Sequence, residues 1–135
     1  MWTCSSCGRR FKQRNQMHTC AVYNLDRHLT GKSAAVVAMY HLLAGQVGEL
    51  GAVEIVPMKS SILFRVKTAF ATVSVRRNWV DVYFSLRSQY SSARFRNVVQ
   101  VSAARFVHGV RLESPDDIDE ELLGWLSKAR ALSSL

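Results

Sequence analysis

The feature that most constrains the fold is a series of short alternating segments between residues 53 and 112. From Val80 to Leu86 every second residue is apolar, and a period of two residues is typical of a strand with one buried face. Strands are predicted at 53–56, 61–66, 69–75, 79–86, 98–101 and 105–112. Residues 76–78 resemble a turn, so we expect an antiparallel hairpin between the third and fourth segments.

Helical patterns precede and follow this strand region. Ser33 is a predicted N-cap for a helix over 34–50, in which apolar residues recur at intervals of three or four. Ser114, Pro115 and the acidic residues after them then predict the start of a second helix, which continues to about Ala131. The chain is therefore expected to adopt an α+β fold, with one antiparallel sheet flanked by two helices.

Length and composition fit one domain with a small N-terminal addition. The chain has 135 residues, and 48% of them are hydrophobic, which is sufficient for a single core. No apolar run approaches the ~18 residues that a membrane span needs, so we expect no membrane partner. We expect residues 1–22 to form a zinc-finger-like module and residues 23–135 to form the α+β domain.

Cysteine and histidine are concentrated near the N-terminus. The motif C-x2-C-G-R-R-F-x6-H-x-C uses all three cysteines of the chain and supplies Cys4, Cys7, His18 and Cys20. Three thiolates and one imidazole are a standard tetrahedral set for structural zinc, and both ligand types match zinc in softness. We therefore expect one structural zinc ion, held in a knuckle that precedes the α+β domain.

Other interpretations of these residues stay open. The three cysteines cannot all pair within one chain, and the N-terminus lacks the basic segment and long apolar run of a secretory signal. We therefore expect a reducing, cytoplasmic setting, where a C-x-x-C pair indicates metal or redox chemistry more often than a disulfide. Redox-active or unliganded thiols are the alternative to zinc. His28 is a further candidate ligand, although a surface or helix-cap role fits it better.

The ligand spacing argues against a DNA-reading finger. Ten residues separate Cys7 from His18, and only Thr19 separates His18 from Cys20. A two-Cys two-His finger has about 12 residues between its ligand pairs and about 3–5 between its last two ligands. Ligands two positions apart cannot share one helix face, so we expect no recognition helix here.

Basic residues are clustered along the chain. The formal net charge is +8, and Asp81 is the only acidic residue between Lys59 and Arg105, whereas Glu113 to Glu121 is strongly acidic. Clustered positive charge attracts phosphates, and solubility is the alternative role of such charge. The residues expected to contact nucleic acid are Arg9, Arg10, Lys12, Arg14, Arg76, Arg77, Arg94 and Arg96.

Several stretches of the chain resemble a bacterial family catalogued as domain of unknown function 5655. The stretches are W-T-C-S-S-C-G-R-R-F…H-T-C at 2–20, H-L-T-G-K at 28–32, Pro57-Met58-Lys59, F-V-H-G-V-R-L at 106–112 and S-P-D-D-I-D-E-E-L at 114–122. The resemblance covers nearly the whole chain. It implies the fold and an N-terminal Cys/His finger, and it supplies no catalytic residues because the activity of the family is unassigned.

Two classes of function fit these observations. The first is a module that binds nucleic acid or another polyanion through phosphates, with stacking on exposed aromatic residues such as Trp79 and Tyr83. The second is a small-ligand or peptide-binding domain, with or without catalysis. The candidate pocket residues for this second class are Lys59, Arg65, Tyr83 and His108.

The sequence itself weakens the pocket interpretation. His108 alternates with apolar residues on one side of its segment, where a histidine is usually a hydrogen-bonded core residue. The nearby carboxylates are Glu54 and Asp81, and no Walker, dinucleotide or G-x-S-x-G motif is present. We favour nucleic-acid binding and leave open whether the protein is an enzyme.

Overall fold

The computed structural model describes residues 2–3, 10–13 and 24–134. Near the N-terminus, β1 (Trp2–Thr3) pairs antiparallel with β2 (Arg10–Phe11). The other strands are β3 (Glu54–Pro57), β4 (Ile62–Arg65), β5 (Ala69–Val75), β6 (Val80–Leu86), β7 (Phe95–Ser102) and β8 (Arg105–Leu112). The helices are α1 (Asp26–Leu29), α2 (Ala34–Glu49), the short 3₁₀ helix η1 (Pro115–Asp117) and α3 (Glu120–Ser133).

Strands β3 to β8 form one six-stranded antiparallel sheet in the order β3-β4-β5-β6-β8-β7. The first four strands follow one another as hairpins, and the expected β5–β6 hairpin is present, with Val75 opposite Val80. The longer connection after β6 carries the chain to the sheet edge, where β7 forms. A short turn then returns β8 to the place between β6 and β7.

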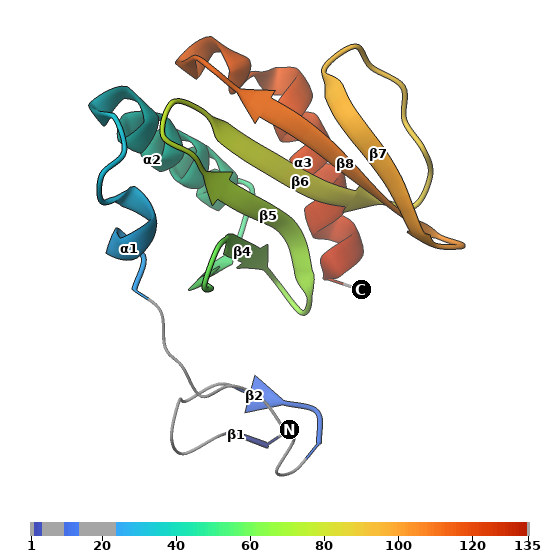
Figure 1. Cartoon of the computed structure of the whole chain (residues 1–135). Helices are drawn as coiled ribbons and strands as arrows, with labels where there is room; N and C mark the ends of the chain where they lie inside the picture. Colours follow the sequence, from blue (N-terminus) through green and yellow to red (C-terminus); the bar gives the residue numbers. More distant parts are fainter. Residues whose placement is uncertain (1, 4–9, 14–23, 135) are drawn as a thin grey trace.

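Both long helices pack on the same face of the sheet (Figure 1). Leu43 of α2, Val82 of β6 and Leu126 of α3 are all fully buried in one core. The predicted α+β fold is confirmed, and the structure adds that its two flanking helices lie together on one side. We call this side of the sheet the covered face and the opposite side the open face.

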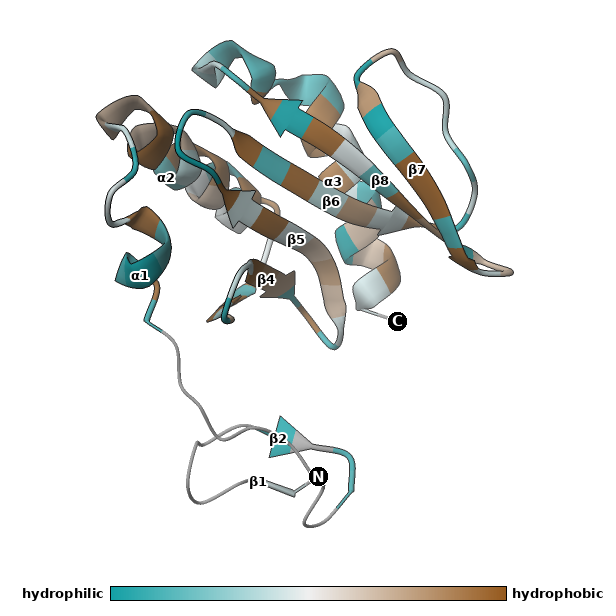
Figure 2. Ribbon diagram, viewed as in Figure 1, coloured by the Kyte–Doolittle hydropathy of each residue, from teal (hydrophilic) through white to brown (hydrophobic). Residues whose placement is uncertain are grey.

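The strand registers assign side chains to these two faces. In β6, Val82 and Phe84 point into the core, while Asp81 and Tyr83 belong to the open face. Figure 2 shows the resulting alternation of hydrophobic and hydrophilic residues along β6. Asp81 lies opposite Arg111 of β8. The open face therefore carries polar residues without a covering helix.

Helix α2 follows the predicted pattern closely. The Ser33 hydroxyl accepts a hydrogen bond from the Val36 amide and caps the helix, as expected. Its buried residues are Val36, Met39, Tyr40, Leu43 and Val47. Burial raises the pKa of Tyr40 to about 12, because the charged phenolate is poorly solvated there. In the described part of the chain, no helix is long and apolar enough to cross a membrane.

The helix expected to run from Ser114 to Ala131 is interrupted, and this part of the prediction was wrong. The Asp117 carboxylate turns back and accepts hydrogen bonds from the amides of Glu113 and Ser114, at 2.8 and 3.1 Å. This arrangement closes η1 as a separate turn. Asp119 then caps α3 by accepting from the Leu122 amide at 3.0 Å.

His28 is not the surface or helix-cap residue that the sequence suggested. It lies in α1 and is only 7% exposed. Its Nε2 lies 2.7 Å from the Met58 carbonyl oxygen, in the turn between β3 and β4. The contact fixes α1 to that turn, so His28 has a structural role.

Candidate functional site

The open face contains a hollow of about 210 Å³ over β6, β7 and β8. The residues that line it are Asp81, Tyr83, Arg96, Asn97, Gly109, Val110 and Arg111. Two guanidinium groups, a phenol and an amide therefore meet at one point of an uncovered sheet. Groups of this kind bind anions through charge-assisted hydrogen bonds.

Gly109 sets the floor of this hollow. Tyr83 of β6 and Asn97 of β7 lie opposite Gly109 on either side of it. A Cβ atom at position 109 would lie 2.3 Å from the Asn97 Oδ1 atom and 2.9 Å from the Tyr83 Cε1 atom. The missing side chain therefore lets the phenol ring and the amide approach each other over β8.

A stacked cluster borders the hollow. The guanidinium of Arg111 lies 4.4 Å from the centre of the Trp79 ring, at cation–π distance. Asp81 fixes both partners, because its carboxylate accepts from the Trp79 Nε1 at 3.1 Å and from the Arg111 Nε at 3.3 Å. Arg76 approaches the same carboxylate with its Nε at 3.5 Å. The Arg111 guanidinium is thus held over the Trp79 ring.

The charge of this region is positive. Among the described residues that line the hollow, Asp81 is the one carboxylate, and it already contacts Arg76 and Arg111. Arg96 is exposed, and it forms no ion pair with any residue that the structure describes. A negatively charged ligand would meet Arg96 directly.

His108 is a core residue. It is fully buried between aromatic rings, stacked on Phe84 with ring centroids 5.6 Å apart. Its Nε2 accepts from the Tyr90 amide at 3.0 Å, so the proton lies on Nδ1, which donates to the Phe106 carbonyl at 3.1 Å. Burial lowers the pKa of His108, although hydrogen bonds to the backbone oppose this shift. Both ring nitrogens are used by the fold.

The residues proposed for a small-ligand pocket do not come together. His108 points to the covered face from β8, whereas Arg65 lies on β4 and contacts Glu54 at 3.6 Å. Lys59 is exposed in the turn between β3 and β4. Of that set, Tyr83 alone lines the hollow. The structure does not assemble Lys59, Arg65 and His108 into one site.

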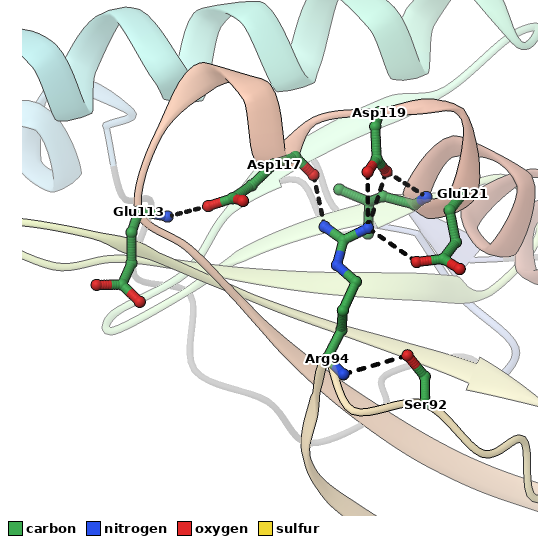
Figure 3. Close-up of polar contacts among 7 residues, drawn as sticks. Ser92, Arg94, Glu113, Asp117, Asp119 and Glu121 are labelled. Carbon is green, nitrogen blue, oxygen red and sulfur yellow. Dashed lines mark hydrogen bonds and ion pairs between the residues drawn. The ribbon is translucent and has the colours of Figure 1, made fainter.

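Arg94 is held by the acidic segment, residues 113–121, instead of facing solvent (Figure 3). Its Nη1 contacts Asp119 Oδ1 at 2.8 Å and Glu121 Oε1 at 3.1 Å, and its Nη2 donates to the Asp117 carbonyl at 2.7 Å. Burial alone would lower the pKa of Arg94, but its bonds to Asp119 and Glu121 outweigh this effect and raise it. Arg94 therefore connects the start of β7 to the start of α3.

The other predicted residues are distributed as follows. Arg76 and Arg77 are exposed beside the β5–β6 turn, and Arg10 and Lys12 are exposed in the N-terminal segment. Cys4, Cys7, Arg9, Arg14, His18 and Cys20 lie outside the described residues. Within residues 2–3, 10–13 and 24–134, no cluster of three or more potential ligands could hold a metal ion.

Comparison with known protein families identifies the family of this domain. A family model described as "Domain of unknown function (DUF5655)" matches residues 25–133. The chain belongs to the DUF5655 family. The matched region runs from the residue before α1 to the last residue of α3, so it contains the whole six-stranded sheet and the hollow. Neither a search of curated proteins nor a search of solved structures finds a match.

Arg111, Asn97 and Gly109, which shape this hollow, were not identified from the sequence. Arg111 alternates with Val110 and Leu112 and pairs with Asp81 across the sheet, which requires the strand register. Asn97 was placed before the expected strand, since β7 begins earlier than predicted. Gly109 could have been recognised from the sequence, because a glycine inside a strand pattern often indicates that another group approaches the backbone closely.

Proposed function

We propose that the open face of the sheet binds single-stranded nucleic acid, or a similar polyanion, with little sequence preference. The main evidence for this proposal is the hollow, in which cationic and planar side chains lie close together. It lies on the face of the sheet that neither α2 nor α3 covers. Sheets with exposed aromatic and basic side chains are a recurring platform for single strands.

The side chains of the open face would have two roles, phosphate binding and base stacking. Arg96 and Arg76 offer guanidinium groups at the surface and would contact phosphates, which gives affinity without reading sequence. The ring of Tyr83 and the plane of Arg111, held over Trp79, offer surfaces on which bases can stack. Asp81 would hold this stack in position. Arg94 has no part in the interface, since the acidic segment occupies it.

The N-terminal segment is proposed to bind one structural zinc ion through Cys4, Cys7, His18 and Cys20. The donor set fits zinc, and thiolate ligands fit a reducing, cytoplasmic environment. The pairing of Thr3 with Arg10 supports this, because it joins the two ends of the segment that contains Cys4 and Cys7. Arg9, Arg10, Lys12 and Arg14 would then add positive charge beside the metal site.

Fluorescence anisotropy with a labelled oligothymidine tests the nucleic-acid proposal. We expect binding at low salt that weakens steeply as salt rises, because phosphate contacts release counterions. Arg96→Gln should weaken binding several-fold and make the salt dependence shallower. Double-stranded DNA of the same length should bind less tightly, since its bases are unavailable for stacking.

Lys59→Gln is the matched control for this experiment. It removes the same charge from an exposed turn at the other end of the sheet order, away from the hollow. The proposal requires Lys59→Gln to leave affinity nearly unchanged. Equal losses in the two variants would mean that only the net charge matters, and no binding at tens of micromolar protein would refute the proposal.

A further inference from the structure

A second cavity, separate from the hollow, opens at the end of the sheet beside the C-terminal turn of α3. Its volume is about 410 Å³, which is within the range of small-molecule sites. The residues that line it are Thr68, Ala69, Phe70, Ser85, Leu86, Arg87, Ala104, Arg105, Ala129, Leu132 and Ser133. We call it the end cavity.

The inner wall of the end cavity is apolar and made partly of small residues. Phe70, Leu86 and Ala129 belong to the buried core, each 1–2% exposed. Ala69, which is half-buried, and Ala104, which is exposed in the turn between β7 and β8, add small side chains to the lining. Short side chains at these positions leave room that larger residues would fill. The inner wall would therefore favour an aliphatic group over a polar one.

The rim of the end cavity is cationic. Among the described residues that line it, Arg87 and Arg105 are the charged ones, and none is a carboxylate. Arg105 is oriented by a hydrogen bond from its Nε to the Ser85 hydroxyl at 3.2 Å. Its terminal nitrogens are not part of that bond. An anion at the rim would therefore contact two guanidinium groups, with no acidic side chain among the described lining residues.

The wall of the end cavity is preformed. The Ser133 hydroxyl donates to the Thr68 carbonyl and accepts from the Thr68 amide, the latter at 3.3 Å. These bonds attach the end of α3 to the turn between β4 and β5. A ligand would therefore not have to order this part of the cavity when it binds.

We propose that the end cavity binds a small amphiphilic carboxylate, with its carboxylate between Arg87 and Arg105 and its aliphatic chain against Phe70, Leu86 and Ala129. Charge complementarity at the rim and the apolar inner wall together select this class over a neutral lipid or a purely polar anion. The inference is independent of nucleic-acid binding, because the two sites have no lining residue in common.

Amide NMR titration of the full chain with octanoate, 1-octanol and acetate tests the proposal. Octanoate should shift the amides of Ala69, Leu86, Arg87 and Ala129 in a saturable way. Octanol should bind at least several-fold more weakly because it lacks the charge, and acetate should produce no saturable shifts. Arg87→Gln should weaken octanoate binding several-fold without changing octanol binding.

Two variants at an exposed turn position test whether the ligand occupies the cavity. Ala104→Leu should fill the space and abolish octanoate binding, whereas Ala104→Ser should preserve it, with both variants checked for an unchanged unfolding temperature. Equal affinities for octanoate and octanol would overturn the proposal. So would unchanged octanoate binding in Ala104→Leu, or shifts spread over the surface.

Discussion

At the scale of single residues, burial determines which titratable groups have a structural role. His108 illustrates this, because a neutral imidazole is stacked on Phe84 and bonded at both nitrogens. The alternation of residues in β8 was enough to predict its core position. The bond from the Tyr90 amide was not predictable, since Tyr90 lies in a loop whose path depends on the whole sheet.

The lowered pKa of His108 predicts a pH dependence of stability. Below its ordinary pKa of 6.5, His108 in the unfolded chain gains a proton that the folded state does not take up. Acidification therefore favours unfolding, and the free energy of unfolding should fall as the pH drops below about 6.5. Urea unfolding of the wild type and His108→Gln between pH 5 and 8 measures this, and the variant should show a smaller slope.

His41→Gln is the control for that measurement. His41 is exposed on α2, so its removal should leave the slope near that of the wild type. An equal slope in the wild type and His108→Gln would contradict the assignment of His108 as the buried, neutral group.

At the scale of elements, the strongest sequence signals were the periodic ones. The stripe of α2 and the alternation of β5, β6 and β8 depend on neighbouring residues, so they could be recognised locally. The interruption before Asp119 could not, because it depends on the Asp117 carboxylate bonding backward to Glu113 and Ser114. The role of Arg94 was also missed, since its partners lie more than twenty residues further along the chain.

The contact between Arg94 and α3 predicts a stability effect. Arg94→Gln should lower the free energy of unfolding by about 1–3 kcal/mol, because it removes charge-assisted hydrogen bonds at a partly buried position. Urea unfolding would measure the loss. Lys67→Gln, at an exposed position in the turn between β4 and β5, should change it by less than about 0.5 kcal/mol.

A double-mutant cycle with Asp119→Asn separates the ion pair from the helix cap. Asparagine can still accept a bond from the Leu122 amide, so the variant keeps the cap but loses the charge. We expect the effects of the two substitutions on the free energy of unfolding to be non-additive. Strict additivity would show that Arg94 and Asp119 do not stabilise each other.

The proposed zinc module predicts a defined metal content. Protein produced without an affinity tag should contain about one zinc per chain by elemental analysis, since four ligands complete a tetrahedral site. Cys7→Ser should lower the zinc content and affinity. Zinc content near zero in the freshly purified wild type would exclude the site.

At the scale of the whole molecule, both long helices cover one face of the sheet and leave the other open. The sequence predicted two helices and a sheet, but it could not place both helices on the same side. That placement depends on how the apolar sides of α2 and α3 share a single core. The hollow is a consequence of it, because a helix on the open face would cover Tyr83 and Arg96.

The core described here also predicts modularity. All of the buried core residues that the structure describes lie between Val36 and Ala129. Removal of residues 1–20 should therefore leave a chain that unfolds cooperatively, which calorimetry or urea denaturation would detect. Loss of the cooperative transition would show that the N-terminal segment is needed to form the core.

Binding of nucleic acid to the open face can be tested in a single spectrum through two tryptophans. Trp79 lies beside the hollow with its Nε1 bonded to Asp81, whereas Trp125 packs on Phe84 under the covered face. Titration with oligothymidine, followed through the indole N–H signals, should shift Trp79 and leave Trp125 almost unmoved. A shift of Trp125 without one of Trp79, or no shift of either at saturating oligonucleotide, would contradict binding at the open face.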